Sequence, residues 1–235
     1  MESPVLVSDS DRAHEILRRL RQTIPIRDED FAATQVAKET HDPFRILVVT
    51  ILSQNCTDVA ALKAYGRLDK AVGVTVSQLR KTRVRTIENA IRVAGLHKQK
   101  AKALGKLSAM VAEEYSGNFT KMLRGTFDEV RDRLQELPNV GPKTTDVLLS
   151  ILGRPTISVD THVDRVSKRL GLAPRKGRYE LVRSSLMKAF HGEDYRVVPM
   201  YFMALGRKIC RARHPLCTEC PINDLCPYDQ KTKSP

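Results

Sequence analysis

The sequence predicts an all-α protein, and three observations support that class. Apolar residues recur at helical spacing along most of the chain, beginning with Ile16, Leu17 and Leu20. Runs of β-branched residues are short, such as 156–159, and they lie between helical segments. Aromatic residues make up 5% of the 235 residues and tryptophan is absent, so aliphatic side chains must fill the core, which suits packed helices.

The helices can be justified in order along the chain. The first follows Ser8, Asp9 and Ser10, whose side chains are suited to cap a helix N-terminus. Pro43 and Phe44 open an apolar run over 46–52, which is too short to cross a membrane and is interpreted as a buried helix. Further helices are predicted over 58–71, 98–115, 142–152, 160–170, 178–190 and 196–210.

Another helix start is marked by Thr126 and Glu129, which have the spacing of a capping box. The apolar residues that follow lie on one helical face: Phe127, Val130, Leu134 and Leu137. The chain has no internal repeat or low-complexity linker, and the residues after Cys226 are predicted to form a loose polar tail.

The charge of the chain is strongly positive. Lysine and arginine number 40 against 27 aspartate and glutamate residues, which gives a formal net charge of +13. Such a surplus attracts polyanions, of which nucleic acid is the commonest, whereas a merely solubilising surface usually has more balanced charge. With no long apolar run and no signal or transit peptide at the start, we expect a cytoplasmic protein close to the nucleoid.

Four cysteines lie together near the C-terminus. Cys210, Cys217, Cys220 and Cys226 fall within 17 residues, separated by six, two and five residues. Structural zinc normally uses two Cys-x-x-Cys pairs, and only the central pair fits that pattern. An iron–sulfur cube accepts four cysteines from one loop, so the spacing favours a cluster over zinc without excluding zinc. The fifth cysteine, Cys56, is predicted to be a small buried apolar side chain.

A tight turn joins two amphipathic helices at 137–144. Asn139 and Gly141 both tolerate positive φ, and Pro142 suits the first position of the next helix. The segment therefore predicts a helix–hairpin–helix, whose exposed amides can bind a phosphate without reading sequence. Because similar turns also join helices in other proteins, the hairpin alone is moderate evidence for DNA binding.

Lys143 and Asp160 are the candidate reactive residues. The positive end of the helix dipole disfavours an ammonium at Lys143, which favours the neutral, nucleophilic amine that forms Schiff bases. The simpler alternative is a phosphate contact or a solvated charge. Asp160 precedes the next helix and is predicted to be its N-cap, and a carboxylate fixed there can also face a developing positive charge. His162 is interpreted as structural.

These features together resemble the endonuclease III family. The hairpin with Lys143 is followed by Val159-Asp160-Thr161-His162 and then by the six-two-five cysteine loop. Upstream, the segments 43–53 and 57–58 resemble the early helix and wedge loop of the family, so the resemblance covers about residues 40 to 228. The cysteine spacing combined with the lysine-containing hairpin is highly specific.

The resemblance implies two all-helical lobes on either side of a DNA cleft. One would be a six-helix barrel over 36–154 with the helix–hairpin–helix, and the other would join 1–35 to 155–235 and hold a 4Fe-4S cluster on Cys210, Cys217, Cys220 and Cys226. The implied activity is that of a DNA glycosylase and AP lyase of base excision repair. Its partner is double-stranded DNA with a damaged base or abasic site, and the expected state is a monomer because a lesion has no two-fold symmetry.

The family mechanism assigns roles to the two reactive residues. Lys143 would attack C1′ of a flipped-out nucleotide and expel the base, and Asp160 would stabilise the oxocarbenium-like charge. The resulting imine would permit β-elimination and a nick on the 3′ side. Oxidised pyrimidines are the usual substrates of the family.

The resemblance also implies a set of DNA-contacting residues. Leu96 matches the apolar wedge that fills the gap left by the flipped base. The remaining expected contacts are Gln54 and Asn55 in the wedge loop, Asn139, Val140 and Gly141 in the hairpin, and Arg211 and Arg213 in the cysteine loop.

This chain departs from the family pattern at three positions. Asn55 stands where glutamine is usual, which leaves the preference for the opposing base open. Asn139 replaces the usual glycine, and Pro142 replaces a residue that is commonly basic. Because Pro142 removes one amide and one charge, the phosphate contact of the hairpin is expected to be weaker.

Two other functions stay open on the sequence. A related glycosylase that removes uracil or thymine opposite guanine, or adenine opposite oxidised guanine, shares the scaffold but usually has another residue at the position of Lys143. A non-catalytic DNA-binding module would use the hairpin and cluster as architecture, and it would need neither Lys143 nor Asp160. Retention of both residues favours the enzyme.

Overall fold

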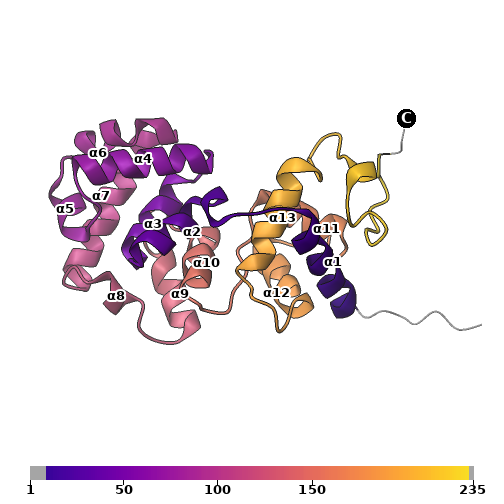
Figure 1. The fold of residues 1–235 in the computed structure, drawn as a ribbon. Coiled ribbons are helices and arrows are strands. Elements are labelled where there is room, and N and C mark those ends of the chain that lie inside the picture. Colours follow the sequence, from indigo (N-terminus) through magenta and orange to yellow (C-terminus); the bar gives the residue numbers. More distant parts are fainter. Residues whose placement is uncertain (1–8, 233–235) are drawn as a thin grey trace, which may run out of the picture. The chain divides into compact units, whose positions relative to one another are not determined.

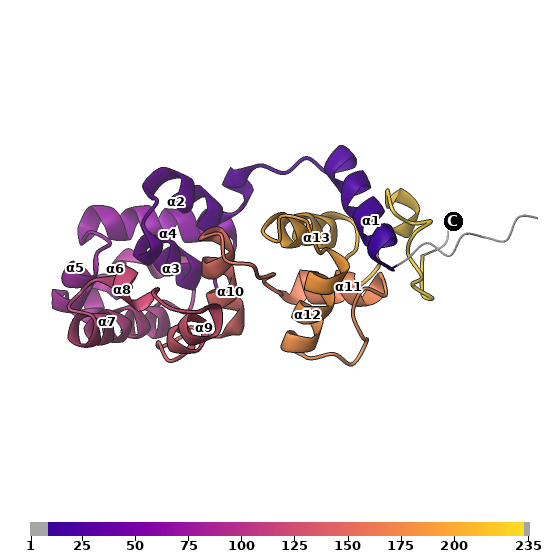
Figure 2. The ribbon, with the colours of Figure 1, turned by 90° about the horizontal axis from the view of Figure 1, so that it is seen from below.

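The computed structural model of the protein describes residues 9–232 (Figures 1 and 2). This range contains thirteen α-helices, three short 3-10 turns and no strand, which confirms the predicted all-α class. The chain forms two compact units: one spans 27–154, and the other comprises the described parts of 1–26 and 155–235. The functional domain bounds implied by the resemblance, 36–154, stay a prediction.

The unit 27–154 is organised around α3 (Pro43–Leu52). Asp42 caps this helix by accepting a hydrogen bond from the amide of Phe44, and Pro43 occupies its first turn. Eight of its ten residues are buried, because α2, α4, α7, α8 and α10 all contact it. The apolar run that predicts a buried helix is thus confirmed.

The remaining helices of this unit surround α3 (Figure 1). They are α2 (Ala32–Thr40), α4 (Asp58–Ala71), α5 (Val76–Lys81), α6 (Val84–Ala90), α7 (His97–Glu114), α8 (Phe119–Met122), α9 (Phe127–Gln135) and α10 (Pro142–Ile151).

Two features fix α9 and α10, the helices on either side of the hairpin. Thr126 and Glu129 form the predicted capping box at the start of α9. Arg131 of α9 makes two hydrogen bonds, of 3.0 and 3.1 Å, to the fully buried carboxylate of Asp146 in α10. A buried charge left unpaired costs several kcal/mol, about 3–5, so this bidentate pair resists any separation of the two helices.

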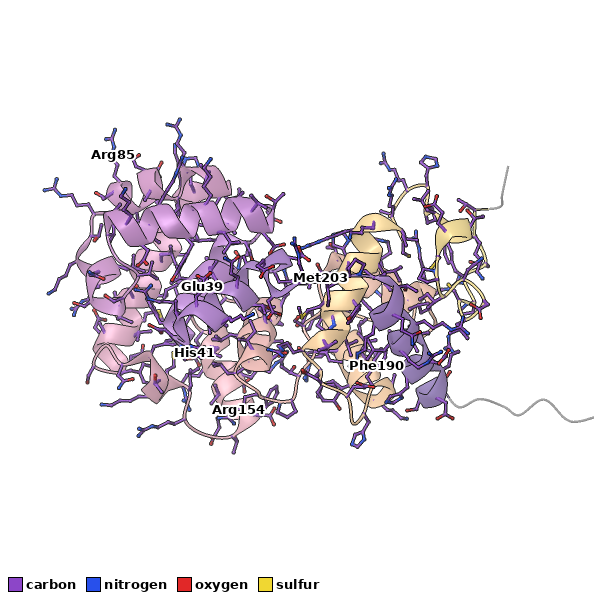
Figure 3. The ribbon with its side chains drawn as sticks, in the orientation of Figure 1. Glu39, His41, Arg85, Arg154, Phe190 and Met203 are labelled. Atoms are coloured by element: carbon purple, nitrogen blue, oxygen red, sulfur yellow. The ribbon has the colours of Figure 1, made fainter. Side chains whose placement is uncertain are left out.

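The other unit contains α1 (Asp9–Thr23), α11 (Thr161–Arg169), α12 (Tyr179–Ala189) and α13 (Val197–Lys208). The apolar face of α1 carries Ile16, Leu17 and Leu20, which are all fully buried, and α1 contacts α12 and α13. Phe190 lies in this core (Figure 3) and meets Phe202 edge-on, with ring centroids 5.7 Å apart. The N-terminal helix is therefore an integral part of the unit that carries the cysteines.

The structure corrects several details of the sequence prediction. Cys56 is half-buried, not fully buried, and its thiol donates to the carbonyl of Leu52 at 3.0 Å. Of the residues expected to cap the first helix, Asp9 and Ser10 lie within α1 and Ser8 lies outside the described residues. The sequence prediction did not include α2, α5, α6 and α8.

The predicted helices over 58–71, 98–115, 142–152, 160–170, 178–190 and 196–210 correspond to α4, α7, α10, α11, α12 and α13, with ends that agree to within two residues. None of the helices in the range 9–232 is both long and apolar enough to cross a membrane.

Candidate functional site

The hairpin between α9 and α10 turns at Asn139. Asn139 has φ 65°, and the amide of Val140 donates to the carbonyl of Leu137 at 3.1 Å. Gly141 does not adopt positive φ: its backbone is extended, with φ −101° and ψ −177°, and it forms the N-cap of α10. Only one of the two residues that tolerate positive φ therefore uses that freedom.

The start of α10 presents free amides. No acceptor within residues 9–232 binds the amides of Gly141, Lys143 or Thr144, and Pro142 has no amide hydrogen. A Cβ added to Gly141 would have no neighbour within 4 Å, so the space in front of the turn is open. Free amides at the positive end of a ten-residue helix form a site suited to an anion such as a phosphate.

Lys143 stands in the first turn of α10 and is exposed. In the described part of the chain its ammonium makes no hydrogen bond or ion pair, so it has no structural partner that would hold it away from a substrate. Its position places a flexible amine next to the free amides of the hairpin.

Asp160 is the N-cap of α11, as predicted. Its Oδ1 accepts hydrogen bonds from the amides of His162 at 2.8 Å and Val163 at 2.7 Å. Its Oδ2 has no partner among the described residues, and the side chain is half-buried. The cap therefore uses one oxygen to fix the carboxylate and leaves the other oxygen available.

His162 has the structural role expected of it. Its Nδ1 lies 3.0 Å from a guanidinium nitrogen of Arg165, and Arg165 also donates to the carbonyls of Gly206 and Cys210 at 3.0 Å each. The pair joins α11 to α13 and to the start of the cysteine loop.

Two loops of the unit 27–154 expose residues in left-handed backbone conformations. Leu96 has φ 45° and its side chain is 51% exposed, and Asn55 has φ 53° and is exposed. A bulky apolar residue in the left-handed region costs about 1–3 kcal/mol and gains nothing from burial here. Such strain persists where the surrounding structure fixes it, and it is common at ligand-binding sites.

Gln54 connects the first of these loops to the hairpin. Its amide nitrogen donates to the carbonyl of Asn139 at 2.9 Å and to the hydroxyl of Thr144 at 3.1 Å. Its amide oxygen accepts from the side chain of Asn139 at 2.8 Å. Both side-chain amides are thus engaged within the protein, whereas the side chain of the neighbouring Asn55 makes no such bond in the described chain.

Val140 is also placed inside the protein. Its side chain is 4% exposed and packs in the core of its unit, and its amide is already bonded. The predicted DNA contacts of Gln54, Asn139 and Val140 stay predictions, and the structure gives each of these residues an internal role as well.

The four cysteines near the C-terminus line one cavity. Cys210, Cys217, Cys220 and Cys226 surround it together with apolar side chains such as Leu205 and Ile222. Burial raises the pKa of the Cys220 thiol to about 11, and the nearby sulfur atoms of the other three cysteines contribute to that rise. Four thiols that face one largely apolar space match the ligand set of an iron–sulfur cluster.

The arrangement does not match a site for a single ion. Within the described residues, no three histidine, cysteine, aspartate or glutamate side chains stand as the ligands of one metal ion would. A zinc site needs four ligand atoms within about 2.3 Å of one centre, whereas a cube of four irons holds its cysteines further apart. The two alternatives thus differ in the spacing that they require of the four sulfur atoms.

Arg169 of α11 joins the cysteine cavity to the exposed loop at 211–214. Its guanidinium donates to Cys210 Sγ at 3.3 Å and to the carbonyls of Arg211 and Ala212 at 2.7 and 3.1 Å. Its Cζ also lies 4.7 Å from the centre of the Tyr228 ring. The loop held in this way exposes the side chains of Arg211 and Arg213, and their predicted phosphate contacts stay a prediction.

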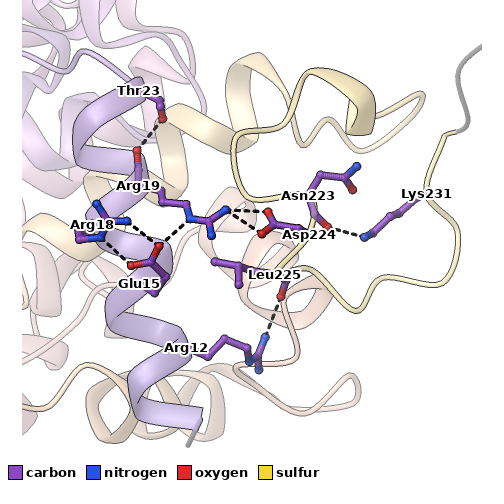
Figure 4. Close-up of polar contacts among 9 residues, drawn as sticks. All are labelled: Arg12, Glu15, Arg18, Arg19, Thr23, Asn223, Asp224, Leu225 and Lys231. Carbon is purple, nitrogen blue, oxygen red and sulfur yellow. Dashed lines mark hydrogen bonds and ion pairs between the residues drawn. The ribbon is translucent and has the colours of Figure 1, made fainter. Parts of the chain in front are cut away.

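The N-terminal helix fastens the far end of the cysteine segment (Figure 4). Arg19 makes two bonds to the carboxylate of Asp224, at 2.8 and 2.9 Å, and Arg12 donates to the carbonyl of Leu225 at 3.3 Å. Glu15 accepts from Arg18 and Arg19, and these two guanidinium groups lower the pKa of Glu15 to about 2. The first helix thus holds the segment that carries Cys220 and Cys226.

The sequence analysis missed two residues whose side chains hold loops by donating to backbone carbonyls, Arg169 and Lys100. Lys100 is 1% exposed and donates to three backbone carbonyls beside the strained loops. Its helical position gives a signal, because it falls on the same face as Leu104, Leu107 and Val111. A lysine in an apolar stripe indicates a buried ammonium. Arg169 gives a weaker signal, since arginines near a helix end are common.

Comparisons with known proteins match this combination of hairpin and cysteine loop. The family described as HhH-GPD superfamily base excision DNA repair protein matches residues 48–191. The iron–sulfur binding domain of endonuclease III matches residues 210–226, which contain all four clustered cysteines. The chain therefore carries a 4Fe-4S binding domain, and the prediction of a cluster is confirmed.

The relatives and solved structures agree with these matches. Endonuclease III of Bacillus subtilis is 36% identical over 198 residues, 81% of this chain and 83% of that protein. Endonuclease III of Sulfolobus acidocaldarius is 31% identical over 220 residues, 93% and 96% of the two chains. A non-covalent endonuclease III–DNA complex has a TM-score of 0.76 at 30% identity, covering 95% and 97% of the chains. A trapped covalent endonuclease III–DNA intermediate has a TM-score of 0.72 at 31% identity, covering 92% and 96%.

Proposed function

This chain belongs to the endonuclease III family of bifunctional base excision repair glycosylase/lyases, and from that premise we propose that Lys143 is its nucleophile and Asp160 its catalytic carboxylate. One observation carries the assignment of Lys143. It is an exposed lysine with no partner in the described chain, and it lies in the same turn as a set of free amides suited to a phosphate.

The proposed reaction begins at the sugar. The Lys143 amine attacks C1′ of the flipped-out nucleotide, and the glycosidic bond breaks, so that the base leaves with the bonding electron pair. The nitrogen passes one proton to the departing base and the other to O4′ as the sugar ring opens, which leaves an imine between C1′ and Nζ. Removal of a proton from C2′ expels the 3′ phosphate and nicks the strand on the 3′ side.

Asp160 acts on the same sugar as a charge and a base. Its Oδ2, which has no partner in the described chain, stabilises the positive charge that develops on the sugar and accepts a proton during elimination. The two amide bonds to Oδ1 fix the carboxylate so that little reorganisation is needed.

Contacts with DNA are divided among four segments. Leu96 fills the gap left by the flipped nucleotide, and the exposed Asn55 faces the opposing base, while Gln54 positions the loop that carries Asn55. The hairpin residues Asn139, Val140 and Gly141 present the phosphate-binding turn, in which Gly141 supplies the free amide. Arg211 and Arg213 bind phosphates from the cysteine loop.

The 4Fe-4S cluster is held by Cys210, Cys217, Cys220 and Cys226. When bound, it supplies four sulfur–iron bonds that cross-link the loop at 211–214 to the rest of its unit. The cluster domain would comprise residues 1–35 and 155–235, and the barrel domain would comprise residues 36–154. The substrates we propose are oxidised pyrimidines and abasic sites in double-stranded DNA, bound by a monomer in the cytoplasm next to the nucleoid.

A nicking assay tests the proposed function. End-labelled duplexes with thymine glycol, an abasic site, or uracil or thymine opposite guanine are incubated with the protein in its cluster-loaded form. We expect base release and a 3′-side nick at thymine glycol and a nick at the abasic site. Release from the mismatched duplexes alone would indicate a mismatch glycosylase. Tight binding of every lesion without a nick would indicate a DNA-binding module and contradict the proposal.

A further inference from the structure

Lys100 is a buried charge that the proposed chemistry does not use. It lies in the first turn of α7, is 1% exposed, and takes part in none of the ion pairs found between residues 9 and 232. Taking an ammonium out of water costs several kcal/mol, and buried lysines are normally paired with a carboxylate. A lysine buried without one must obtain its stabilisation elsewhere.

Three backbone carbonyls provide that stabilisation. Lys100 Nζ donates to the carbonyls of Leu52, Gln54 and Ala94, each at 2.7 Å. An ammonium has three donors, so all of them are satisfied. The carbonyl of Leu52 belongs to the last turn of α3, where the helix dipole is negative and attracts a cation. Burial lowers the pKa of Lys100, and the three short bonds favour its charged form.

The three carbonyls come from the segments that carry the strained residues. Leu52 and Gln54 precede Asn55, and Ala94 precedes Gly95 and Leu96. The backbone amide of Lys100 also donates to the carbonyl of Leu96 at 3.0 Å, which begins α7. Both exposed loops are therefore attached to the same side chain, which belongs to helix α7.

The same turn of α7 reaches the hairpin. Gln99 donates to the side-chain oxygen of Asn139 at 3.3 Å, and Gln54 bonds to Asn139 and Thr144. The loop at 54–55, the loop at 95–96 and the phosphate-binding turn thus form one hydrogen-bonded network.

We propose that Lys100 is a positioning residue that holds the loops of Asn55 and Leu96 in the single arrangement that enters DNA. This inference rests on the proposed function of those two loops. Without the ammonium, the carbonyls of Gln54 and Ala94 would lose their donor, and the carbonyl of Leu52 would keep only the thiol of Cys56. The left-handed conformation of Leu96 would then relax toward the less strained forms that a short loop prefers, and the loop of Asn55 would lose its fixed position. The residue would act on lesion binding through Leu96 and Asn55, without touching DNA.

A double-mutant cycle tests this proposal. Dissociation constants are measured for the cluster-loaded protein on a duplex with a tetrahydrofuran abasic analogue, which can be bound but not cleaved. The four proteins are wild type, Leu96→Ala, Lys100→Met and the double variant. Because Leu96 is half exposed, its truncation leaves the melting temperature unchanged, and Met fills the space of Lys100 while removing the ammonium.

The expected result is strong coupling. Each single substitution weakens binding about tenfold, about 1.4 kcal/mol, and the double variant binds no more weakly than Lys100→Met. Leu107→Ala, a fully buried change in the same helix, is the control for lost stability, and its loss should simply add to that of Leu96→Ala.

Other outcomes distinguish a failure of the positioning role of Lys100 from a failure of the proposed function. Additive losses for Lys100→Met and Leu96→Ala would overturn the positioning role, as would a Leu96→Ala variant that binds like wild type. A wild-type protein that does not bind the analogue would contradict the proposed function itself. If Lys100→Met does not fold, Lys100→Arg takes its place in the cycle, since it keeps a cation but cannot reproduce three bonds from one nitrogen.

Discussion

Asp160 shows how a single side chain can serve both the fold and the reaction. Its two oxygens have different surroundings, because Oδ1 accepts two amide bonds at the start of α11 and Oδ2 has no partner in the described chain. The structural role of a helix cap and the proposed role of a catalytic carboxylate are thus compatible. They can also be separated by substitution, because only the second role needs the negative charge.

Asp160→Asn is expected to keep the fold and lose the activity. The asparagine side-chain oxygen can accept the same two amide bonds, so the melting temperature stays at the wild-type value. Base release at thymine glycol falls about 10²–10⁴-fold, the usual effect of losing a positioned acid or base. Asp160→Ala is the matched comparison, since it loses the cap as well and about 0.5–2 kcal/mol of stability. An Asp160→Asn enzyme with wild-type turnover would refute the catalytic assignment.

Gly141 offers a test of the anion site at the hairpin. Its extended backbone suits any residue, and an added Cβ meets nothing within 4 Å. Gly141→Ala should therefore leave the free energy of unfolding unchanged or slightly raised. The methyl group would nevertheless stand in front of the free amides, so the dissociation constant for abasic-analogue DNA should rise about tenfold or more, as for one lost charge-assisted bond.

Gly66→Ala is the control variant for Gly141→Ala, because it adds the same methyl group at another open position. Gly66 lies within α4, has no neighbour within 4 Å of an added Cβ, and is distant in sequence from the predicted contacts. Binding that is equally strong in wild type and in both variants would show that the turn at Gly141 does not approach a phosphate.

At the scale of elements, α11 links the proposed chemistry to the cluster. It is capped by Asp160 and ends at Arg169, which bonds to Cys210 Sγ and to the carbonyls of the loop at 211–212. Arg165, one turn earlier, bonds to the carbonyl of Cys210. The helix thus fixes the carboxylate proposed for catalysis at one end and the loop proposed to bind phosphates at the other.

Arg169→Ala is expected to loosen the cluster without unfolding the helices. Each charge-assisted bond is worth about 1.5–3 kcal/mol, so the cluster should be lost to a chelator about ten times faster or more, as followed by its visible absorbance. Arg175→Ala is the control, because Arg175 and its partner Asp229 are both exposed. Equal rates of cluster loss in the two variants would show that Arg169 only packs against Tyr228.

The elements that the sequence predicts are those with long apolar periodicity. The buried run of α3 and the capping box of α9 are read directly from side-chain type and spacing. The helices α5 and α8 have six and four residues, too short to show a period, although Thr75 and Asn118 cap them. The prediction was least complete where a side chain acts through distant backbone, as Lys100 does across 46 residues to Gln54.

The roles of individual site residues follow from sequence less fully than the helices do. Spacing indicates Lys143, Asp160 and the cysteines, because their chemistry depends on local context. It does not show that Gln54 is engaged by Asn139, since that contact joins positions 85 apart in the chain. Long-range hydrogen bonds need the folded backbone before they can be recognised.

The whole molecule combines a uniform attraction for DNA with a few specific contacts. The net charge of +13 is spread over both units, with exposed side chains such as Arg85 on α6 extending into solvent (Figure 3). This field draws the protein to any duplex and weakens with salt. In our proposal, recognition of damage therefore comes from the exposed loops and the hairpin, and chemistry from Lys143 and Asp160.

Borohydride trapping tests the central claim, Schiff-base chemistry at Lys143, most directly. Cluster-loaded wild type, Lys143→Ala and Lys106→Ala, the last an exposed lysine of α7, are mixed with thymine glycol and abasic duplexes and reduced. We predict a covalent protein–DNA adduct on both substrates for wild type and Lys106→Ala and none for Lys143→Ala. An adduct of undiminished yield in Lys143→Ala would contradict the account, because another amine would then be the nucleophile.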